Sequence, residues 1–202
     1  FRTLLHEFGH ALHGIFSHVT YQSLAGTSVY RDFVELPSQI MENWAEQKEW
    51  LTRAGRHYIT GEAMEAEWID KLLSSRNFNE GFMGCRQLSF AYLDMAWHSL
   101  AQPFTGDVEQ YEKKAMEDMS LLPRIEGTAM STSFGHIFGG GYAAGYYGYK
   151  WAEVLDADAF SRFQDEGIFN RDTANDFRTK ILAKGGSRHP MQLYIDFIGR
   201  EP

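Results

Sequence analysis

The sequence has a single cysteine, few prolines and no long apolar run. One cysteine, Cys85, cannot form an internal disulfide framework, which suits a reducing compartment. Five prolines and no low-complexity tract leave little room for linkers between domains. The longest apolar runs are interrupted by His, Gly or charged residues well short of a membrane span. We therefore expect a single globular domain, residues 1–202, without a membrane segment.

Basic residues are also in deficit. The chain has 19 Lys and Arg against 27 Asp and Glu, a formal net charge of −8, and no Lys/Arg cluster forms a phosphate-binding stripe. No basic-then-apolar signal pattern occurs at its start. We therefore expect neither nucleic acid nor membrane as a partner, and a cytoplasmic location for the full-length protein.

What the sequence does have is apolar residues at three- and four-residue steps, the period of an amphipathic helix. Its 44% hydrophobic content is enough for a sizeable core. Helices are predicted around 4–16 and over 34–54, 62–73, 79–100, 107–119, 142–165, 172–184 and 190–198. The predicted fold class is all-α, a mainly helical lobe with at most a short β-hairpin near residues 19–33.

The first predicted helix contains the motif His6-Glu7-Phe8-Gly9-His10. Histidines four apart on a helix project from one face and can hold one ion. A catalytic zinc takes three protein ligands and lowers the pKa of water from 15.7 to about 7, and Glu7 is placed to accept the proton. The alternative is two ordinary histidines and a solvated glutamate. We favour one Zn²⁺ per chain because all three residues occur in this order and spacing.

The third ligand must come from elsewhere in the chain. The long metzincin pattern needs Gly and then His after the second histidine, but His13 and Phe16 occupy those positions, so that class is excluded. A carboxylate from a following helix is the other solution. The acidic candidates are Asp32, Glu35, Glu42 and Glu46.

Among these candidates we favour Glu35. It opens the next predicted helix, where an antiparallel return would bring it to the level of His6 and His10. Asp32 would then suit the layer behind the ligands, holding a ligand imidazole through its other N–H. A helix cap is an equally good interpretation of Asp32.

Three segments resemble the thimet oligopeptidase family of zinc peptidases. They are HEFGHALHG at 6–14, RDFVELPSQ at 31–39 and FGHIFGGGYAAGYY at 134–147. The resemblance spans nearly the whole chain. The Gly26-Thr27 pair, the Arg31-Asp32 pair and the triple glycine are most similar to the bacterial peptidyl-dipeptidase branch, also called dipeptidyl carboxypeptidase.

The resemblance implies an almost wholly helical protein whose two lobes flank a deep channel, with the zinc helix on the channel floor. Short unstructured peptides would enter this channel and folded proteins would not. The chain would be the C-terminal part of the catalytic domain of a longer parent polypeptide, truncated upstream of Phe1. The remainder of that polypeptide would complete the channel.

The resemblance also implies roles for individual residues. In matching positions His6, His10 and Glu35 are zinc ligands and Glu7 is the general base. His136, Tyr142 and Tyr149 contact the substrate, and Tyr146 belongs to the same cluster. A tyrosine hydroxyl or an imidazole aimed at a developing oxyanion can supply roughly a hundred- to thousandfold in rate. The Gly26-Thr27 loop would bind peptide backbone or would be an ordinary turn.

The expected function is therefore zinc-dependent hydrolysis of short peptides, releasing dipeptides from a free carboxyl end. One alternative is an oligopeptidase of the same family that cuts internal bonds. Another is a metal-binding lobe that is inactive without the rest of the parent polypeptide.

Overall fold

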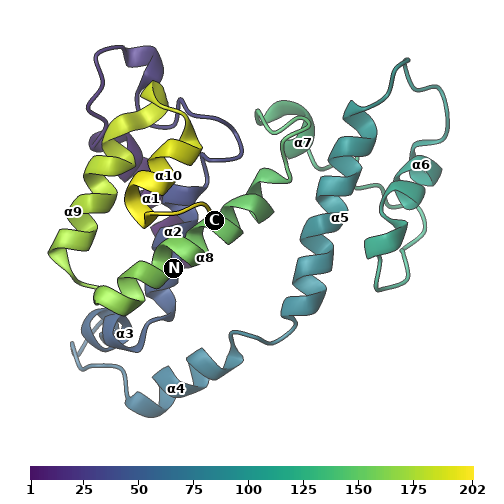
Figure 1. Cartoon of the computed structure of the whole chain (residues 1–202). Coiled ribbons are helices and arrows are strands. Elements are labelled where there is room, and N and C mark those ends of the chain that lie inside the picture. The colour runs from purple at the N-terminus through teal and green to yellow at the C-terminus, as the bar shows by residue number, and fades with distance from the viewer. The chain divides into compact units, whose positions relative to one another are not determined.

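The computed structural model describes residues 1–202, and helices are its only regular secondary structure, with ten α-helices (Figure 1). Its only strand-type pairing is an isolated bridge between Arg56 and Ala63. The all-α prediction is confirmed. The hairpin allowed for near residues 19–33 is absent, and that segment contains one 3₁₀ turn, Gln22–Leu24. No helix combines the length and the apolar character needed to cross a membrane.

The chain divides into two compact units. The first comprises Phe1–Arg76 together with Trp151–Pro202, and the second comprises Asn77–Lys150. Each unit has its own hydrophobic core. The single-domain organisation expected for residues 1–202 stays a prediction.

The first unit is built from helices at both ends of the chain. Its helices are α1 (Arg2–Ile15), α2 (Leu36–Glu42), α3 (Lys48–Ala54), α4 (Ala66–Ser75), most of α8 (Gly148–Glu166), α9 (Arg171–Lys180) and α10 (Pro190–Ile198). Two further 3₁₀ segments are Asn43–Glu46 and Leu182–Ser187. The yellow-green α9 and the yellow α10 contact each other, and the Leu182–Ser187 segment between them contacts α1 (Figure 1).

Helices α1 and α2 form the closest helix pair of this unit. Pro37 lies in the first turn of α2, where its missing N–H costs nothing. The inward face predicted for α2 is confirmed, because Ile40 is buried in the core. The apolar stripe of α1 is different: Leu4 and Ile15 are 63% and 70% exposed. The face of α1 that packs against α2 is the one with Gly9.

Asp156, on α8, is a buried carboxyl in this core whose titration should be measurable. Burial, helped by the charges of Glu153 and Glu42, raises its pKa to about 7, although Asn43 donates a hydrogen bond of 2.8 Å to it. The folded protein therefore keeps a proton that the unfolded chain releases near pH 4. Stability should fall as the pH rises from about 4 to about 7.

We expect Asp156→Asn to remove this dependence and to raise the free energy of unfolding at pH 8 by roughly 1–3 kcal/mol. Urea unfolding of both proteins at pH 5 and pH 8 measures the free energy of unfolding and its pH dependence. Asp165→Asn, an exposed position on the same helix, is the control and should change neither value. Equal stability of wild type and Asp156→Asn at pH 8 would contradict the assignment.

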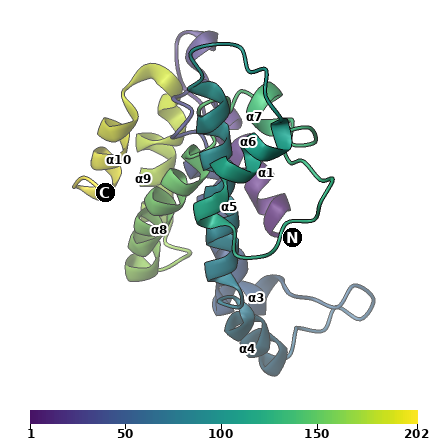
Figure 2. The same cartoon turned by 90° about the vertical axis from the view of Figure 1, so that its right-hand side faces the viewer.

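The second unit contains α5 (Glu80–His98), α6 (Val108–Ala115), the 3₁₀ turn Glu117–Met119 and the short α7 (His136–Gly139). Figures 1 and 2 both show α5 and α6 side by side. Asp107 caps α6 by accepting a 3.0 Å hydrogen bond from the backbone N–H of Gln110, as the sequence predicts.

The helix predicted over 142–165 begins later than expected, at Gly148. Gly141 and Ala144 have φ values of +79° and +53°, in the left-handed region that interrupts a right-handed helix. Tyr142 and Tyr146 consequently lie in a loop before α8, and only Tyr149 lies in its first turn. The prediction that these tyrosines share one helix is wrong.

Candidate metal centre

The structure brings His6, His10 and Glu35 together. The two histidines lie on one face of α1, and Glu35 immediately precedes α2. Oε2 of Glu35 is 3.3 Å from Nε2 of His6 and 3.3 Å from Nε2 of His10. One ligand atom from each residue lies within 4.8 Å of the other two. These three residues form the only group of its kind in the chain.

The spacing of these atoms fits zinc. Ligands placed tetrahedrally at about 2.0–2.1 Å from a zinc ion lie about 3.3–3.4 Å from each other. Both His–Glu distances are 3.3 Å. Two imidazoles and one carboxylate are also a donor set of catalytic zinc sites, which keep a fourth position open. The residues present therefore suit Zn²⁺.

Two residues behind the candidate ligands, Glu42 and Ser38, hold them in place, and the sequence did not predict this role for either. Glu42 accepts a 2.8 Å hydrogen bond from Nδ1 of His6, which leaves Nε2 facing Glu35. Ser38 donates a 2.8 Å hydrogen bond to Oε2 of Glu35 and is fully buried. The sequence contains a clue to both contacts, because Ser38 and Glu42 follow Glu35 by three and seven residues and so lie on the same helix face as Glu35.

The acidic neighbours affect the protonation of His6. Hydrogen bonds to Glu35 and Glu42 raise the pKa of His6 to about 9, against the opposing effect of burial. Glu42 is in turn held by Arg2, whose guanidinium is 2.9 Å away. The carboxylates around His6 thus favour positive charge at this position.

Among the alternative candidates, Glu42 and Glu46 lie outside the ligand set. Glu42 binds the far nitrogen of His6, and Glu46 pairs with Arg2 at 3.1 Å. Asp32 does not hold either ligand imidazole through its second nitrogen. Nδ1 of His6 is taken by Glu42, and the buried Nδ1 of His10 has no partner. Glu42 reaches α1 because it lies two turns along α2, whereas Asp32 precedes that helix.

Glu7 lies on α1 between the two histidines in sequence and is exposed. No hydrogen bond or ion pair to the chain holds its carboxylate. It is therefore available to accept a proton from a solvent-accessible position, as the sequence analysis expects of a general base.

The Gly26-Thr27 turn packs against the C-terminal end of α1, away from His6. Gly26 has φ +54°, and its backbone N–H donates a 2.9 Å hydrogen bond to Oγ of Ser17. A Cβ at this position would meet Gly14 Cα at 3.0 Å. The N–H of Gly26 is thus already used, while Thr27 is exposed. Substrate binding by this pair stays a prediction, with Gly26 better explained as a tight turn.

The distance between α1 and α2 depends on Gly9 of the motif. A Cβ built on Gly9 would lie 2.2 Å from the carbonyl oxygen of Pro37 and 2.6 Å from Cα of Ser38. Both contacts are with backbone, so no side chain can move aside. The glycine therefore lets the helix with His6 and His10 approach the helix that Glu35 begins.

We expect Gly9→Ala to push α1 and α2 apart and to lower zinc affinity at least tenfold, since metal sites tolerate only about 0.2 Å of error. Overpacking should also cost about 1–3 kcal/mol of stability. Zinc content of the purified protein and thermal unfolding measure the two effects. Gly14→Ala is a matched control on the same helix, because nothing lies within 4 Å of its added Cβ. Full zinc content in Gly9→Ala would contradict this account.

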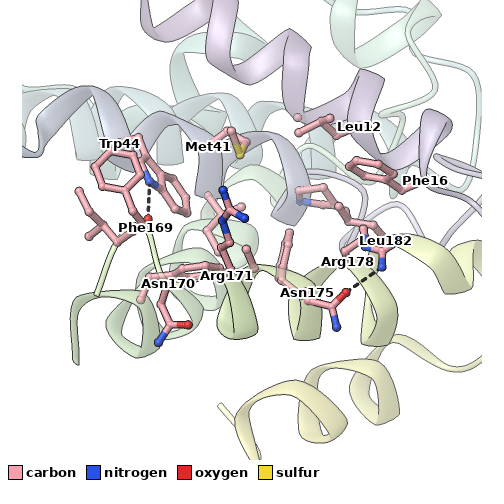
Figure 3. A pocket seen from close by; sticks show the side chains of 17 residues that line it. Leu12, Phe16, Met41, Trp44, Phe169, Asn170, Arg171, Asn175, Arg178 and Leu182 are labelled. Atoms are coloured by element: carbon pink, nitrogen blue, oxygen red, sulfur yellow. Dashed lines mark hydrogen bonds between the residues drawn. The ribbon is translucent and has the colours of Figure 1, made fainter. Parts of the chain in front are cut away.

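A largely apolar cavity of the first unit lies elsewhere. It has a volume of about 480 Å³ and is enclosed by α1 and α2 on one side and α9 on the other (Figure 3). Trp44 at its edge donates a 3.0 Å hydrogen bond to the carbonyl of Ile168. Its lining contains no carboxylate, imidazole, thiol or hydroxyl group. The cavity therefore has no group that could perform acid–base or metal chemistry.

The second unit holds the other predicted site residues as one ring cluster, comprising His136, Tyr142, Tyr146 and Tyr149. His136 stacks on Tyr142 with ring centroids 4.8 Å apart, and Tyr142 stacks on Tyr149 at 5.0 Å. Nε2 of His136 is 2.9 Å from the hydroxyl of Tyr149. Tyr146 is the buried member, and burial raises its pKa. The cluster presents imidazole and phenol groups as hydrogen-bonding partners.

A helical protein in which two histidines, a glutamate ligand and an adjacent carboxylate share a helix pair has the arrangement of a metallopeptidase. Sequence comparison makes the assignment specific. The sequence profile of peptidase family M3 matches residues 1–202, and the chain belongs to this family. The family resemblance seen in three sequence segments is confirmed.

Individual relatives match the same region. Oligopeptidase A of Escherichia coli (strain K12) is 44% identical over 208 residues, covering 99% of this chain and 30% of its own length. Dipeptidyl carboxypeptidase of the same organism is 43% identical over 203 residues, with shares of 99% and 30%. Probable cytosolic oligopeptidase A of Arabidopsis thaliana is 41% identical over 206 residues, with shares of 99% and 29%. The chain thus spans less than a third of the length of these relatives.

Proposed function

We propose that the chain is the C-terminal catalytic part of a longer zinc-dependent peptidase that hydrolyses short peptides and releases dipeptides from their carboxyl end. The observation that carries the proposal is the convergence of His6, His10 and Glu35 beside Glu7. Zinc held by these residues would act as a Lewis acid on a peptide carbonyl and lower the pKa of water.

In this proposal the residues of the chain handle the proton and the developing charge. Glu7 accepts a proton from the attacking water and returns it to the leaving amine. The hydroxyls of Tyr142 and Tyr149, with the imidazole of His136, donate hydrogen bonds to the carbonyl oxygen as it becomes negative. Support comes from the family match and from the geometry within each group of residues.

The release of dipeptides is the finer part of the proposal. It is supported by the similarity of Gly26-Thr27, Arg31-Asp32 and the triple glycine to the peptidyl-dipeptidase branch. A second function, cleavage of internal bonds without regard to the carboxyl end, is favoured by relatives named oligopeptidase A with 44% identity. Identities of 43% and 44% do not separate the two.

Product analysis on the parent polypeptide separates the two functions. One peptide is offered in two forms, with a free carboxyl end and with an amide cap, and the products are identified by mass spectrometry. Dipeptide release from the free acid, lost on the capped form, supports the proposed function. Equal cleavage of both forms at internal bonds supports an oligopeptidase.

The same experiment with the 202-residue chain tests the third alternative, a metal-binding lobe. Zinc binding without turnover by the chain, alongside turnover by the parent polypeptide, would assign metal binding to these residues and catalysis to the complete protein. Turnover by the chain alone would exclude the inactive-lobe alternative.

A further inference from the structure

A buried carboxylate in the second unit holds the loop that contains the ring cluster. Asp94 lies on α5 and is fully buried. Its Oδ1 accepts a 2.9 Å hydrogen bond from the backbone N–H of Ala144, and its Oδ2 accepts one of 2.9 Å from the N–H of Tyr146. Nδ1 of His98 lies 2.8 Å from Oδ1. Both oxygens of this buried carboxylate therefore accept hydrogen bonds from one short loop, and one of them also contacts His98.

The loop needs such support because of its backbone. Ala144 has φ +53°, and among non-glycine residues of the chain only Asn79 shares a positive φ. Left-handed backbone is unfavourable for a residue with a Cβ and persists where the surroundings enforce it. Ala144 is itself exposed, so no packed side chain fixes it. The hydrogen bonds that the backbone N–H groups of Ala144 and Tyr146 donate to Asp94 are the contacts that hold this conformation.

The position of the loop determines the position of the rings. Tyr142 and Tyr146 lie two residues on either side of Ala144. The Tyr146 ring packs at 6.0 Å from Phe90 of α5, and its hydroxyl accepts a 3.3 Å hydrogen bond from Gln87. The Tyr142 ring stacks on those of His136 and Tyr149, which also contact each other with centroids 5.8 Å apart. A loop released at Ala144 would lose this stacking.

We propose that Asp94 is a positioning residue of the peptidase, which sets the ring cluster by anchoring the left-handed turn at Ala144. It does not contact the substrate and acts through the backbone of Ala144 and Tyr146. The inference rests on the proposed function, in which Tyr142, Tyr149 and His136 contact the substrate.

The test uses Asp94→Asn in the parent polypeptide, which keeps the shape but replaces one acceptor oxygen by a donor. We expect faster hydrogen exchange at the amides of Ala144 and Tyr146. We also expect a fall of about tenfold or more in kcat/KM on a short peptide, since small misplacements of positioned groups are costly in rate. Zinc content should stay at the wild-type level. Asp107→Asn, which also removes a carboxylate from a backbone N–H in this unit, is the matched control and should leave kcat/KM unchanged.

Two further variants separate positioning from general damage. Ala144→Gly removes the Cβ from the left-handed residue, so in the Asp94→Asn background it should restore part of the lost kcat/KM. Ala144→Val raises the cost of the same backbone without touching the buried carboxylate, and it should lower kcat/KM in an otherwise folded protein. Recovery in the first variant and loss in the second support the inference.

Unchanged amide exchange or unchanged kcat/KM in Asp94→Asn would overturn the inference. So would an absence of recovery in the double variant, because that marks a general loss of folding. Failure of the proposed function is distinguishable by Glu7→Gln: if that variant keeps full turnover, the catalytic assignment fails. If Glu7→Gln is inactive and Asp94→Asn is normal, only the role of Asp94 fails.

Discussion

Replacing Glu7 with Gln should reduce kcat of the parent polypeptide at least about a hundredfold and leave its zinc content unchanged. The amide keeps the size of the side chain but cannot accept a proton. The carboxylate is exposed on α1 and engaged by no other group of the chain, so the substitution removes proton transfer without disturbing packing. The ligand atoms of His6, His10 and Glu35 stay in place.

The measurement compares kcat and metal content of the same preparation. Glu49→Gln, an exposed glutamate that pairs with Arg53 four residues on, is the control and should have wild-type kcat. Turnover at the wild-type level in Glu7→Gln would show that another group accepts the proton. A parallel loss of zinc would show that Glu7 supports the metal centre.

Glu35→Ala should have the second large effect, a loss of bound zinc. Its carboxylate is 1% exposed and lies 3.3 Å from both histidine nitrogens. Removal of an outer partner of a metal ligand typically costs 10–100-fold in affinity, so removal of a ligand should cost at least about a hundredfold. Zinc titration against a competing chelator measures the change.

Variants of the residues that hydrogen-bond to the ligands give smaller losses of zinc affinity with which Glu35→Ala can be compared. Ser38→Ala and Glu42→Ala each remove one hydrogen bond to a ligand and should weaken zinc binding by roughly 10–100-fold. Glu46→Ala, which removes only a contact to Arg2, is the control. Stoichiometric zinc in Glu35→Ala would indicate that Asp32 or Glu42 supplies the third ligand.

The sequence could predict that His6, His10 and Glu35 converge, because a shared metal ion would impose a local pattern on them. Two histidines that bind one ion from a helix must lie four apart, and a third ligand at the start of the returning helix follows from chain direction. Glu42 was not assigned, because its contact with His6 depends on how closely α1 and α2 approach. Gly9 allows the two helices to approach closely, but this could be recognised only once the structure showed that it faces Pro37 and Ser38.

The tyrosine segment shows where periodicity misleads. Tyr142, Tyr146 and Tyr149 have helical spacing, yet Ala144 between them has a left-handed backbone that no local pattern announces. The contact that explains it comes from Asp94, about fifty residues earlier in the chain. Long-range hydrogen bonds of this kind override local propensity.

The division of the ligands between two helices has a consequence for the chain between them. His10 and Glu35 bracket residues 11–34, which contain no α-helix beyond the last turns of α1. An ion bound by both would act as a reversible cross-link that closes this loop, and closing it in the folded state alone adds stability. Metal removal would then loosen the 17–34 segment first, so protease sensitivity there reports occupancy of the site.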